Sequence, residues 1–374
     1  MSALTVNSGS TSVKLALYDL GDAPARLASE RHTGRGLDPQ ALLQGFAARL
    51  HAPPQVIAHR VVHGGTRFVE PTLLTEEVVA AIEELSALAP LHNPQALRWI
   101  AAARAVWGTQ VPQIAVFDTA YFAALPRVAA EYALPPHLGT EHGVRRYGFH
   151  GLAHEAMWRS WCALYPDLDR GGRLITVQLG GGCSVAAIAQ GRPLDTSMGF
   201  SPLEGLVMAT RAGDVDAAIV PYLAQRLALT SQEVIARLNN EAGLAGLSAS
   251  NADPGALLAD GAPRAQYAVE LYCYRLRKYL GAYLAVLEGC EGIVFGGGVG
   301  EHVPGVRART LAGLAWAGIT LDPALNDAAT GGAARIDAAT GPVKVHVAAV
   351  DEELVLARAA AAAHARALSQ ESRL

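Results

Sequence analysis

Residues 1–20, MSALTVNSGSTSVKLALYDL, place a polar turn between two short apolar runs. The runs are Leu4–Val6 and Val13–Leu17, and the turn is Asn7–Ser12. This pattern predicts two adjacent strands joined by the turn. A two-residue asparagine or glycine turn would be enough to join such strands. The surplus of hydroxyl groups therefore indicates that the turn binds a ligand.

The same pattern recurs at residues 174–189, LITVQLGGGCSVAAIA. The repetition favours two related domains, each with a ligand-binding hairpin. Further strands are predicted at Val56–Val62, Ile114–Phe117, Gly292–Phe295 and Val343–Val347. Helical periodicity occurs at Glu76–Leu88, Pro94–Ala105, His154–Leu164, Asp216–Gln225, Ser231–Asn239, Ala265–Leu287 and Glu352–Ala367. Alternating strands and helices predict an α/β class with largely parallel sheets.

The bulk composition narrows the class of protein. The chain has 374 residues, of which 51% are hydrophobic. One core stops growing near ~250–300 residues, so we expect two domains. The net charge of -4 and a pI near 6.3 disfavour a nucleic-acid partner. Four cysteines without a C-x-x-C pair predict reduced thiols in a cytoplasmic protein.

Neither a secretory signal nor a membrane-spanning segment is predicted. The N-terminus has no basic stretch followed by an apolar one. No run reaches the ~18 apolar residues that a spanning helix needs.

The first turn carries groups that suit phosphate. Backbone N–H groups, the hydroxyls of Ser10 and Ser12, and the ammonium of Lys14 can all donate to phosphate oxygens. The residues alone also fit a capped turn with an exposed lysine.

Two further stretches carry potential anion-binding groups. Arg60 lies in a predicted apolar strand, so its side chain must be paired or face a ligand. His92 and Asn93 precede Pro94, which fits the first turn of a helix, where anions are favoured. A structural salt bridge for Arg60 and a capping role for Asn93 fit the same residues.

Acidic and imidazole groups occur at the ends of predicted elements. Asp118 ends an apolar strand, where open α/β sheets place metal-binding or catalytic carboxylates. Glu352 opens the last helix and could hold magnesium through water or favour the helix N-terminus. His150 lies among aromatic residues and glycines in RRYGFHG, which also fits a core histidine.

Two glycine triplets, Gly180–Gly182 and Gly296–Gly298, follow strands and would let the backbone approach a ligand closely. Arg211 lies between polar turns in MATRAGD. Residues Leu247–Gly261 are predicted to be a loop.

In this order, the motifs resemble those of the acetate kinase family, within the sugar kinase, actin and heat-shock chaperone ATPase superfamily. The motifs are N-S-G-S-T-S-x-K, H-R-V-V-H-G-G, L-x-P-L-H-N-P, F-D-T-A, R-R-Y-G-F-H-G, T-S-M-G-F-S-P-L-E-G-L-x-M-x-T-R-x-G-D and G-V-G-E. They run from Asn7 to Ala357, and their joint occurrence by chance is negligible.

The resemblance implies two duplicated ribonuclease H-like (actin-like ATPase) α/β domains around a central cleft. The first would comprise residues 1–118 with 353–374, and the second residues 119–352. It implies the reaction ATP + acetate ⇌ ADP + acetyl phosphate, with Mg²⁺ or Mn²⁺ as the metal. It also implies a homodimer, with Ala265–Leu287 as a plausible interface helix.

The resemblance assigns a role to each candidate residue. Catalysis falls to Asp118, His150, Arg60 and Arg211, with His92 in support. The metal is assigned to Asn7, Asp118 and Glu352. The nucleotide is assigned to Ser10, Ser12, Lys14, Gly180, Gly181, Gly182, Asp253, Gly297, Gly298, Val299 and Gly300. A small acyl pocket is assigned to Val62, Leu91, Phe149 and Pro202, which favours acetate over propionate.

The nucleotide side departs from the family pattern. The family has histidine at Gln178, asparagine at Gly181 and arginine at Gly255. A phosphoryl donor different from ATP therefore stays open. A propionate kinase, a related sugar kinase and a non-catalytic nucleotide sensor stay open as well.

Overall fold

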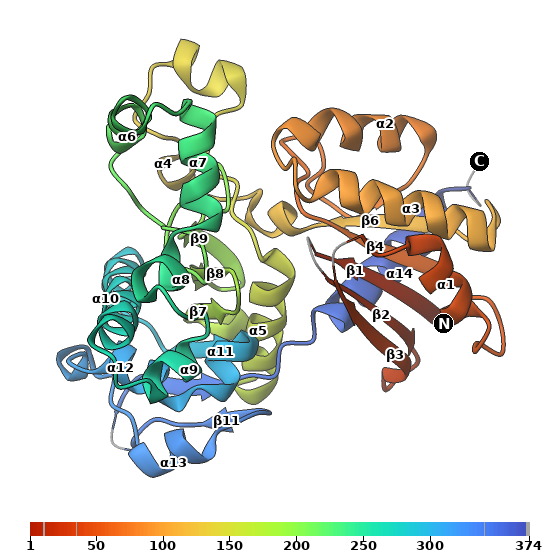
Figure 1. The fold of residues 1–374 in the computed structure, drawn as a ribbon. Helices are drawn as coiled ribbons and strands as arrows, with labels where there is room; N and C mark the ends of the chain where they lie inside the picture. Colours follow the sequence, from red (N-terminus) through yellow and green to blue (C-terminus); the bar gives the residue numbers. More distant parts are fainter. Residues whose placement is uncertain (10–11, 35, 340, 372–374) are drawn as a thin grey trace. The chain divides into compact units, whose positions relative to one another are not determined.

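A computed structural model describes residues 1–9, 12–34, 36–339 and 341–371. The chain divides into two compact units, coloured along the sequence in Figure 1. Unit 1 comprises Met1–Ala123 and Asp351–Leu374, and unit 2 comprises Ala124–Val350.

Unit 1 is built on a six-stranded mixed sheet with the order β3-β2-β1-β4-β6-β5. The strands are β1 (Ser2–Ser8), β2 (Ser12–Asp19), β3 (Ala25–Thr33), β4 (Val56–Val61), β5 (Thr72–Leu73) and β6 (Gln113–Phe117). Strand β1 runs parallel to β4, and β4 runs parallel to β6. The carboxyl ends of these three strands therefore lie at one edge of the sheet.

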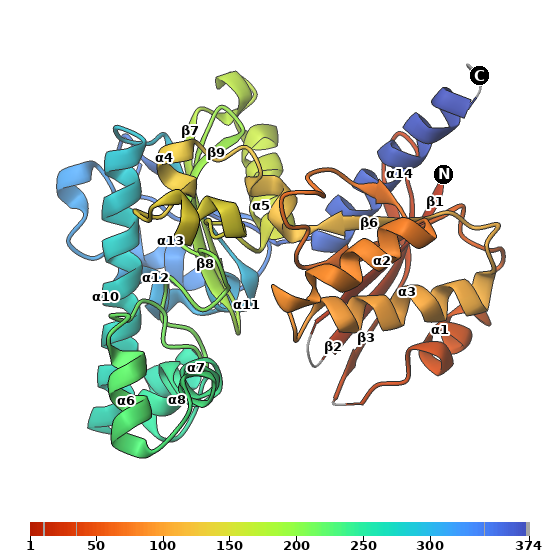
Figure 2. The same ribbon diagram turned by 90° about the horizontal axis from the view of Figure 1, so that it is seen from above.

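Helices cover both faces of this sheet (Figure 2). They are α1 (Pro39–Ala47), α2 (Glu76–Glu84), α3 (Asn93–Trp107) and α14 (Glu352–Glu371). Alternate apolar residues of β1 and β2, such as Leu4, Val6 and Leu15, form a core with Phe46 and Trp99 of α1 and α3. The alanine-rich helix α14 packs against β1, β4 and β6, because small side chains allow close approach to the sheet.

Unit 2 repeats the sheet, with the order β9-β8-β7-β10-β12-β11. The strands are β7 (Arg173–Leu179), β8 (Cys183–Ala189), β9 (Arg192–Thr196), β10 (Gly292–Gly296), β11 (Ala334–Arg335) and β12 (Lys344–Val347). Strands β7, β10 and β12 are parallel, as are β1, β4 and β6. The helices are α4 (Arg127–Ala130), α5 (Gly151–Leu164), α6 (Ile219–Leu227), α7 (Ser231–Asn240), α8 (Gly243–Ser248), α9 (Pro254–Ala259), α10 (Pro263–Val286), α11 (Gly297–His302), α12 (Pro304–Leu311) and α13 (Pro323–Ala328).

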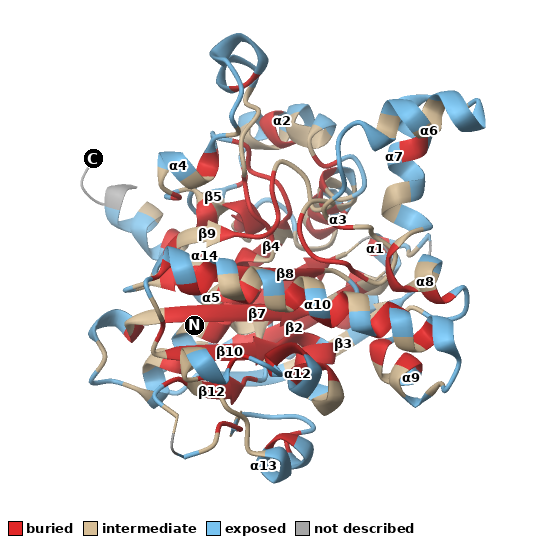
Figure 3. Cartoon of the chain, turned by 90° about the vertical axis from the view of Figure 1, so that its left-hand side faces the viewer, coloured by how far each residue is buried: buried red, intermediate tan, exposed pale blue. Residues whose placement is uncertain are grey.

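The two sheets correspond strand by strand, which confirms the predicted duplication. Residue pairs also correspond: Thr5 lies opposite Ala16 in unit 1, as Thr176 lies opposite Ala186 in unit 2. Figure 3 shows that β7, β10 and β12 are buried, while α10 alternates between buried and exposed residues. Within the described ranges, no helix is long and apolar enough to cross a membrane.

The eight predicted strands are present, and so are the seven predicted helices. The predicted loop at Leu247–Gly261 is wrong over part of its length, because α8 ends within it and α9 lies inside it. Pro254 occupies the first turn of α9, and the Asp253 side chain caps it by accepting from the Ala256 N–H at 2.8 Å.

Candidate active site

In unit 1, three strand ends gather polar groups at one edge of the sheet. The Asn7 Nδ2 atom donates to Glu352 Oε2 at 2.9 Å and to Glu353 Oε1 at 2.8 Å. The Asn7 Oδ1 atom accepts from Arg60 Nη1 at 3.2 Å. Asn7 therefore links β1 to β4 and to the first turn of α14.

Arg60 forms an ion pair with Asp118, which directly follows β6. Its Nε atom lies 3.0 Å from Asp118 Oδ2, and Nη2 lies 2.5 Å from the same oxygen. Asp118 is 1% exposed. Burial raises the pKa of Asp118, and the Arg60 guanidinium opposes that rise. Burial alone would lower the pKa of Arg60. The carboxylates of Asp118, Glu352 and Glu353 outweigh that effect, so the pKa of Arg60 is raised.

The charges of this cluster suit a divalent cation. Three carboxylates, on Asp118, Glu352 and Glu353, face two cations, Arg60 and Lys14, with Lys14 Nζ 3.3 Å from Glu353 Oε1. Among the described residues, no three acidic, histidine or cysteine side chains cluster tightly enough to enclose a metal. Magnesium commonly uses one or two carboxylates and several waters, so this donor set fits it.

In unit 2, His150 precedes α5 and has a left-handed backbone conformation, with φ of 59°. Its Nδ1 atom lies 2.9 Å from Ser184 Oγ on β8. A Cβ atom placed on Gly182 would lie 3.1 Å from His150 Nε2 and 3.5 Å from Arg211 Nη1. The imidazole and the guanidinium therefore converge on the backbone of the glycine turn after β7.

Arg211 forms no ion pair with a carboxylate within the part of the chain that the structure describes. Its Nη1 atom donates to the Pro202 carbonyl at 3.3 Å. Burial lowers the pKa of Arg211, and the neighbouring Cys183 opposes that change. A half-buried arginine that lacks an acidic partner is a natural binding group for an anion.

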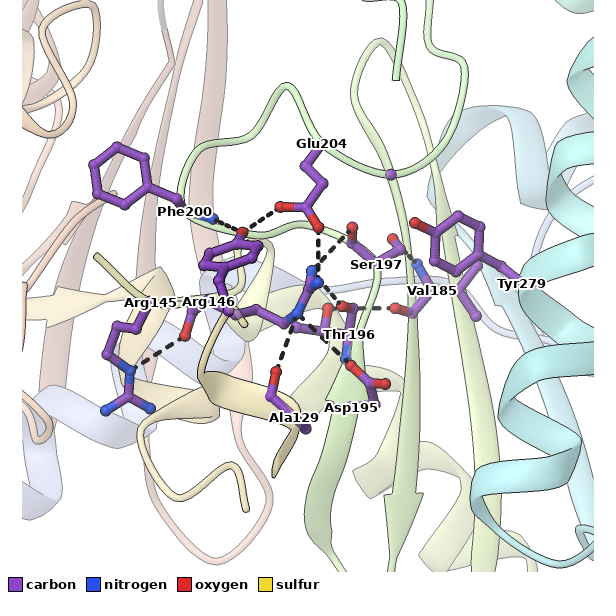
Figure 4. Close-up of polar contacts among 12 residues, drawn as sticks. Ala129, Arg145, Arg146, Val185, Asp195, Thr196, Ser197, Phe200, Glu204 and Tyr279 are labelled. Carbon is purple, nitrogen blue, oxygen red and sulfur yellow. Dashed lines mark hydrogen bonds and ion pairs between the residues drawn. The ribbon is translucent and has the colours of Figure 1, made fainter. Parts of the chain in front are cut away.

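A polar network holds the loop that carries Pro202 and Arg211 (Figure 4). Arg146 Nη2 donates to Glu204 Oε1 at 2.7 Å, and the Tyr132 hydroxyl donates to the other Glu204 oxygen. Arg146 Nη1 also donates to the Thr196 carbonyl at 3.2 Å. The network ties the loop to β9 and to the segment around α4.

The far end of the same loop is fixed separately. The Tyr279 hydroxyl of α10 donates to Asp214 Oδ2 at 2.8 Å, and Asp214 Oδ1 accepts from the Gly205 N–H at 2.8 Å. The Ala209 N–H donates to the Gly181 carbonyl at 3.2 Å. The loop therefore rests directly on the glycine turn.

The predicted nucleotide residues of unit 2 lie mostly at one sheet edge. Gly297, with φ of 75°, follows β10 and opens α11; a Cβ atom there would lie 2.5 Å from the Leu179 carbonyl oxygen. The two glycine turns are therefore adjacent, because β10 and β7 are parallel neighbours. Gly298, Val299 and Gly300 continue α11.

Other predicted residues are less closely grouped. Asp253 is exposed and caps α9. In unit 1, Lys14 and Ser12 lie on β2, whereas Ser10 lies outside the described residues.

The four acyl-pocket candidates divide between the units. Val62 and Leu91 belong to unit 1, and Phe149 and Pro202 belong to unit 2. Val62 and Phe149 are buried, whereas Leu91 is 62% exposed. His92 directly precedes α3.

Sequence reasoning gave one residue that positions these groups a different role and missed three others. Asn93 was expected to cap a helix, but it lies inside the first turn of α3, and its amide forms two hydrogen bonds with the backbone of His63, at 3.0 and 3.1 Å. Ser184, Glu204 and Glu353 were missed. Only tertiary contacts identify these three residues.

The fold and these contacts define a class: a duplicated α/β protein with an acidic strand edge in one unit and, in the other, a glycine turn faced by an imidazole and a guanidinium. A model of the acetokinase family matches residues 40–358. The acetate kinase of Clavibacter michiganensis subsp. michiganensis (strain NCPPB 382) is 42% identical, over 97% of this chain and 99% of the relative. The chain belongs to the acetokinase family.

Solved structures agree with this assignment. The acetate kinase of Porphyromonas gingivalis matches with a TM-score of 0.87 and 32% identity, over 97% of this chain and 99% of that one. A propionate kinase from Francisella tularensis subsp. tularensis SCHU S4 matches with a TM-score of 0.86 and 30% identity, over 96% and 98%.

Proposed function

We propose that the protein is an acetate kinase that transfers the terminal phosphoryl group of ATP to acetate, reversibly, giving acetyl phosphate and ADP. The observation that carries the proposal is the convergence of His150 Nε2 and Arg211 Nη1 on Gly182, with no carboxylate paired to Arg211 among the described residues. Two donors held at a glycine turn suit an anion that gains charge density in a transition state.

The reaction needs no general base in this proposal. Acetate is ionised at neutral pH, because carboxylic acids titrate near ~4. The chain must instead offset repulsion between two anions and hold them in line. Arg60 and Arg211 bind and orient the anions, and His150 donates to the transferred group.

Magnesium is the proposed metal, and it would neutralise phosphate charge when bound. Asp118, Glu352 and Asn7 would hold it through their oxygens or bound water, as the surplus of carboxylate in this cluster supports. Manganese has similar ligand preferences and would substitute. Lys14 and the glycine turns would bind phosphate oxygens.

Acetate is the proposed acceptor, with propionate as the weaker one. Val62, Leu91, Phe149 and Pro202 are the residues proposed to contact the methyl group. One methylene changes selectivity by only about 1–3 kcal/mol, so propionate should react slowly rather than not at all. The 30% identity to a propionate kinase supports keeping this second substrate in view.

A homodimer in the cytoplasm completes the proposal. The four cysteines are free thiols, which suits a reducing compartment. Helix α10 presents exposed Tyr267 and Tyr274 and would contribute to the interface.

Initial rates of acyl hydroxamate formation with acetate, and of ADP release with either acceptor, test the activity. We expect turnover with acetate, ATP and magnesium, and none with glucose as acceptor. Turnover of glucose would indicate a sugar kinase. Nucleotide binding without turnover of either acceptor would indicate a sensor and would contradict the proposal. Rates with GTP and pyrophosphate would identify the preferred donor.

A further inference from the structure

A chain of hydrogen bonds extends from His150 into the core of unit 2. Ser184 Oγ lies 2.9 Å from His150 Nδ1 and 2.7 Å from His154 Nε2. His154 Nδ1 lies 2.7 Å from Thr176 Oγ1. Ser184, His154 and Thr176 are each 0% exposed.

The fold places these four residues together. His150 precedes α5, and His154 lies one turn further along it, so both face the sheet on which α5 packs. Thr176 of β7 and Ser184 of β8 lie two residues apart in register, on the same face of the sheet.

We propose that Thr176, His154 and Ser184 are positioning residues that orient the His150 ring and keep its proton on Nε2, where it faces Gly182. The inference deepens the proposed function and rests on it. It gives a role to three residues that are not proposed to bind a substrate.

Counting donors leaves two possible directions for the chain. Burial lowers the pKa of His154 well below 6.5, with a further contribution from the charge of His150, so its ring carries one proton. A neutral imidazole donates through one nitrogen and accepts through the other. His154 must therefore accept from one of its two hydroxyl neighbours and donate to the other.

Only one direction leaves a neutral His150 able to donate at Nε2. In it, Thr176 donates to His154 Nδ1, His154 Nε2–H donates to Ser184, and Ser184 donates to His150 Nδ1. In the reverse direction the proton of a neutral His150 lies on Nδ1, and Nε2 has none.

Paired variants at position 176 separate hydrogen bonding from packing. Thr176→Val keeps the shape but removes the hydroxyl, whereas Thr176→Ser keeps the hydroxyl and removes a methyl group. Thr5→Val is the matched control, because Thr5 is the corresponding buried threonine of β1 and its hydroxyl donates to the Ala16 carbonyl.

We expect Thr176→Val to lower kcat about 10-fold, the lower end of the effect of outer partners on a functional histidine. KM values for acetate and ATP should change less than about 2-fold, and Thr176→Ser and Thr5→Val should retain kcat. Equal kcat for Thr176→Val and the wild type, or a larger loss in Thr176→Ser, would overturn the inference.

Ser184→Ala supplies a second variant should Thr176→Val not fold. We expect it to lower kcat, and the double variant Thr176→Val/Ser184→Ala to lose little more, because both changes break one chain. Wild-type kcat in Ser184→Ala would contradict the inference.

Nitrogen-15 NMR of the histidine rings provides a readout that does not need activity. In the wild type we expect the His150 proton on Nε2, assigned with His150→Asn. This separates the two proposals: an inactive wild type with the Nε2 proton contradicts only the proposed function, and a proton on Nδ1 of neutral His150 contradicts the positioning chain.

Discussion

The same strand order builds sheet edges of opposite chemistry in the two units. In unit 1, Arg60 near the end of β4 pairs with Asp118 after β6. By the register of the parallel strands, the equivalent positions of unit 2 are Gly296 and Val350. A Cβ atom on Gly296 would lie 2.4 Å from Val350 Cγ2. An ion pair in one unit therefore corresponds to close backbone packing in the other.

A second pair of equivalent positions also differs in chemistry between the two units. Asn7 and Lys14 face each other across β1 and β2, and Gln178 and Ser184 do so across β7 and β8. Asn7 and Lys14 contact the acidic first turn of α14, whereas Ser184 contacts His150. The scaffold is shared, and a few edge residues make different contacts in the two units.

Replacing either arginine should have the largest effect. We expect Arg60→Ala and Arg211→Ala each to lower kcat by about 10²–10³ or more, because each removes a preorganised donor to a developing anion. Arg159→Ala is the control, since Arg159 lies outside the proposed site, where it pairs with Glu155 one helical turn away and lies over the Trp158 ring. Wild-type rates for an arginine variant in the hydroxamate assay would remove that residue from catalysis.

Variants of two neighbouring glutamates test which carboxylate of the acidic edge of unit 1 binds the metal. We expect Glu352→Gln to raise the magnesium concentration for half-maximal rate about 10–100-fold, as loss of an outer carboxylate does. Glu353→Gln should raise it less, because Glu353 already pairs with Lys14. Equal magnesium dependence of the two variants would contradict the assignment of the metal to Glu352.

A substitution in the proposed acyl pocket should have a smaller effect, on the selectivity between acetate and propionate. We expect Val62→Ala to increase the kcat/KM ratio of propionate to acetate by about 10-fold, because it removes bulk near the proposed methyl site. Val13→Ala, a buried valine of β2 outside that set, is the control for a general loss of packing. An unchanged ratio in Val62→Ala would place the acyl pocket elsewhere.

The glycine-rich edge of unit 2 should show the smallest effect. Gln178 Oε1 is buried and has no hydrogen-bond partner within the described part of the chain. We expect Gln178→Ala to raise KM for ATP about 3–10-fold, the worth of one hydrogen bond, with KM for acetate unchanged. Gln190→Ala, at the exposed end of the same hairpin, is the control. A change in KM for acetate alone would contradict a nucleotide-side role.

Much of the fold was predictable because apolar periodicity is strong in buried elements. Strand β7 is buried along nearly its whole length, and its apolar run predicted it. Strand β3 was missed because its residues are half-buried or exposed and include charged ones. Helix α9 was missed because it is only six residues long, although Asp253-Pro254 is a start signal.

The family prediction is confirmed by the family model and the relatives, while the residue roles stay predictions. Sequence patterns identified Arg60 and Asp118 separately, and parallel pairing of β4 with β6 brings them together. The Thr176–His154 contact joins residues 22 positions apart through the packing of α5 on β7. Spacing alone could not predict it, because it depends on which helix face meets which strand.

The most direct test of the central claim is a double-mutant cycle on kcat for acetyl phosphate formation. The proposal is that Arg60 and Arg211 both act on the phosphoryl group that is transferred to acetate. We expect Arg60→Ala/Arg211→Ala to lose little more activity than the more impaired single variant, because groups acting as a unit are strongly non-additive. If the two losses multiplied, the arginines would act independently, and the account would be contradicted.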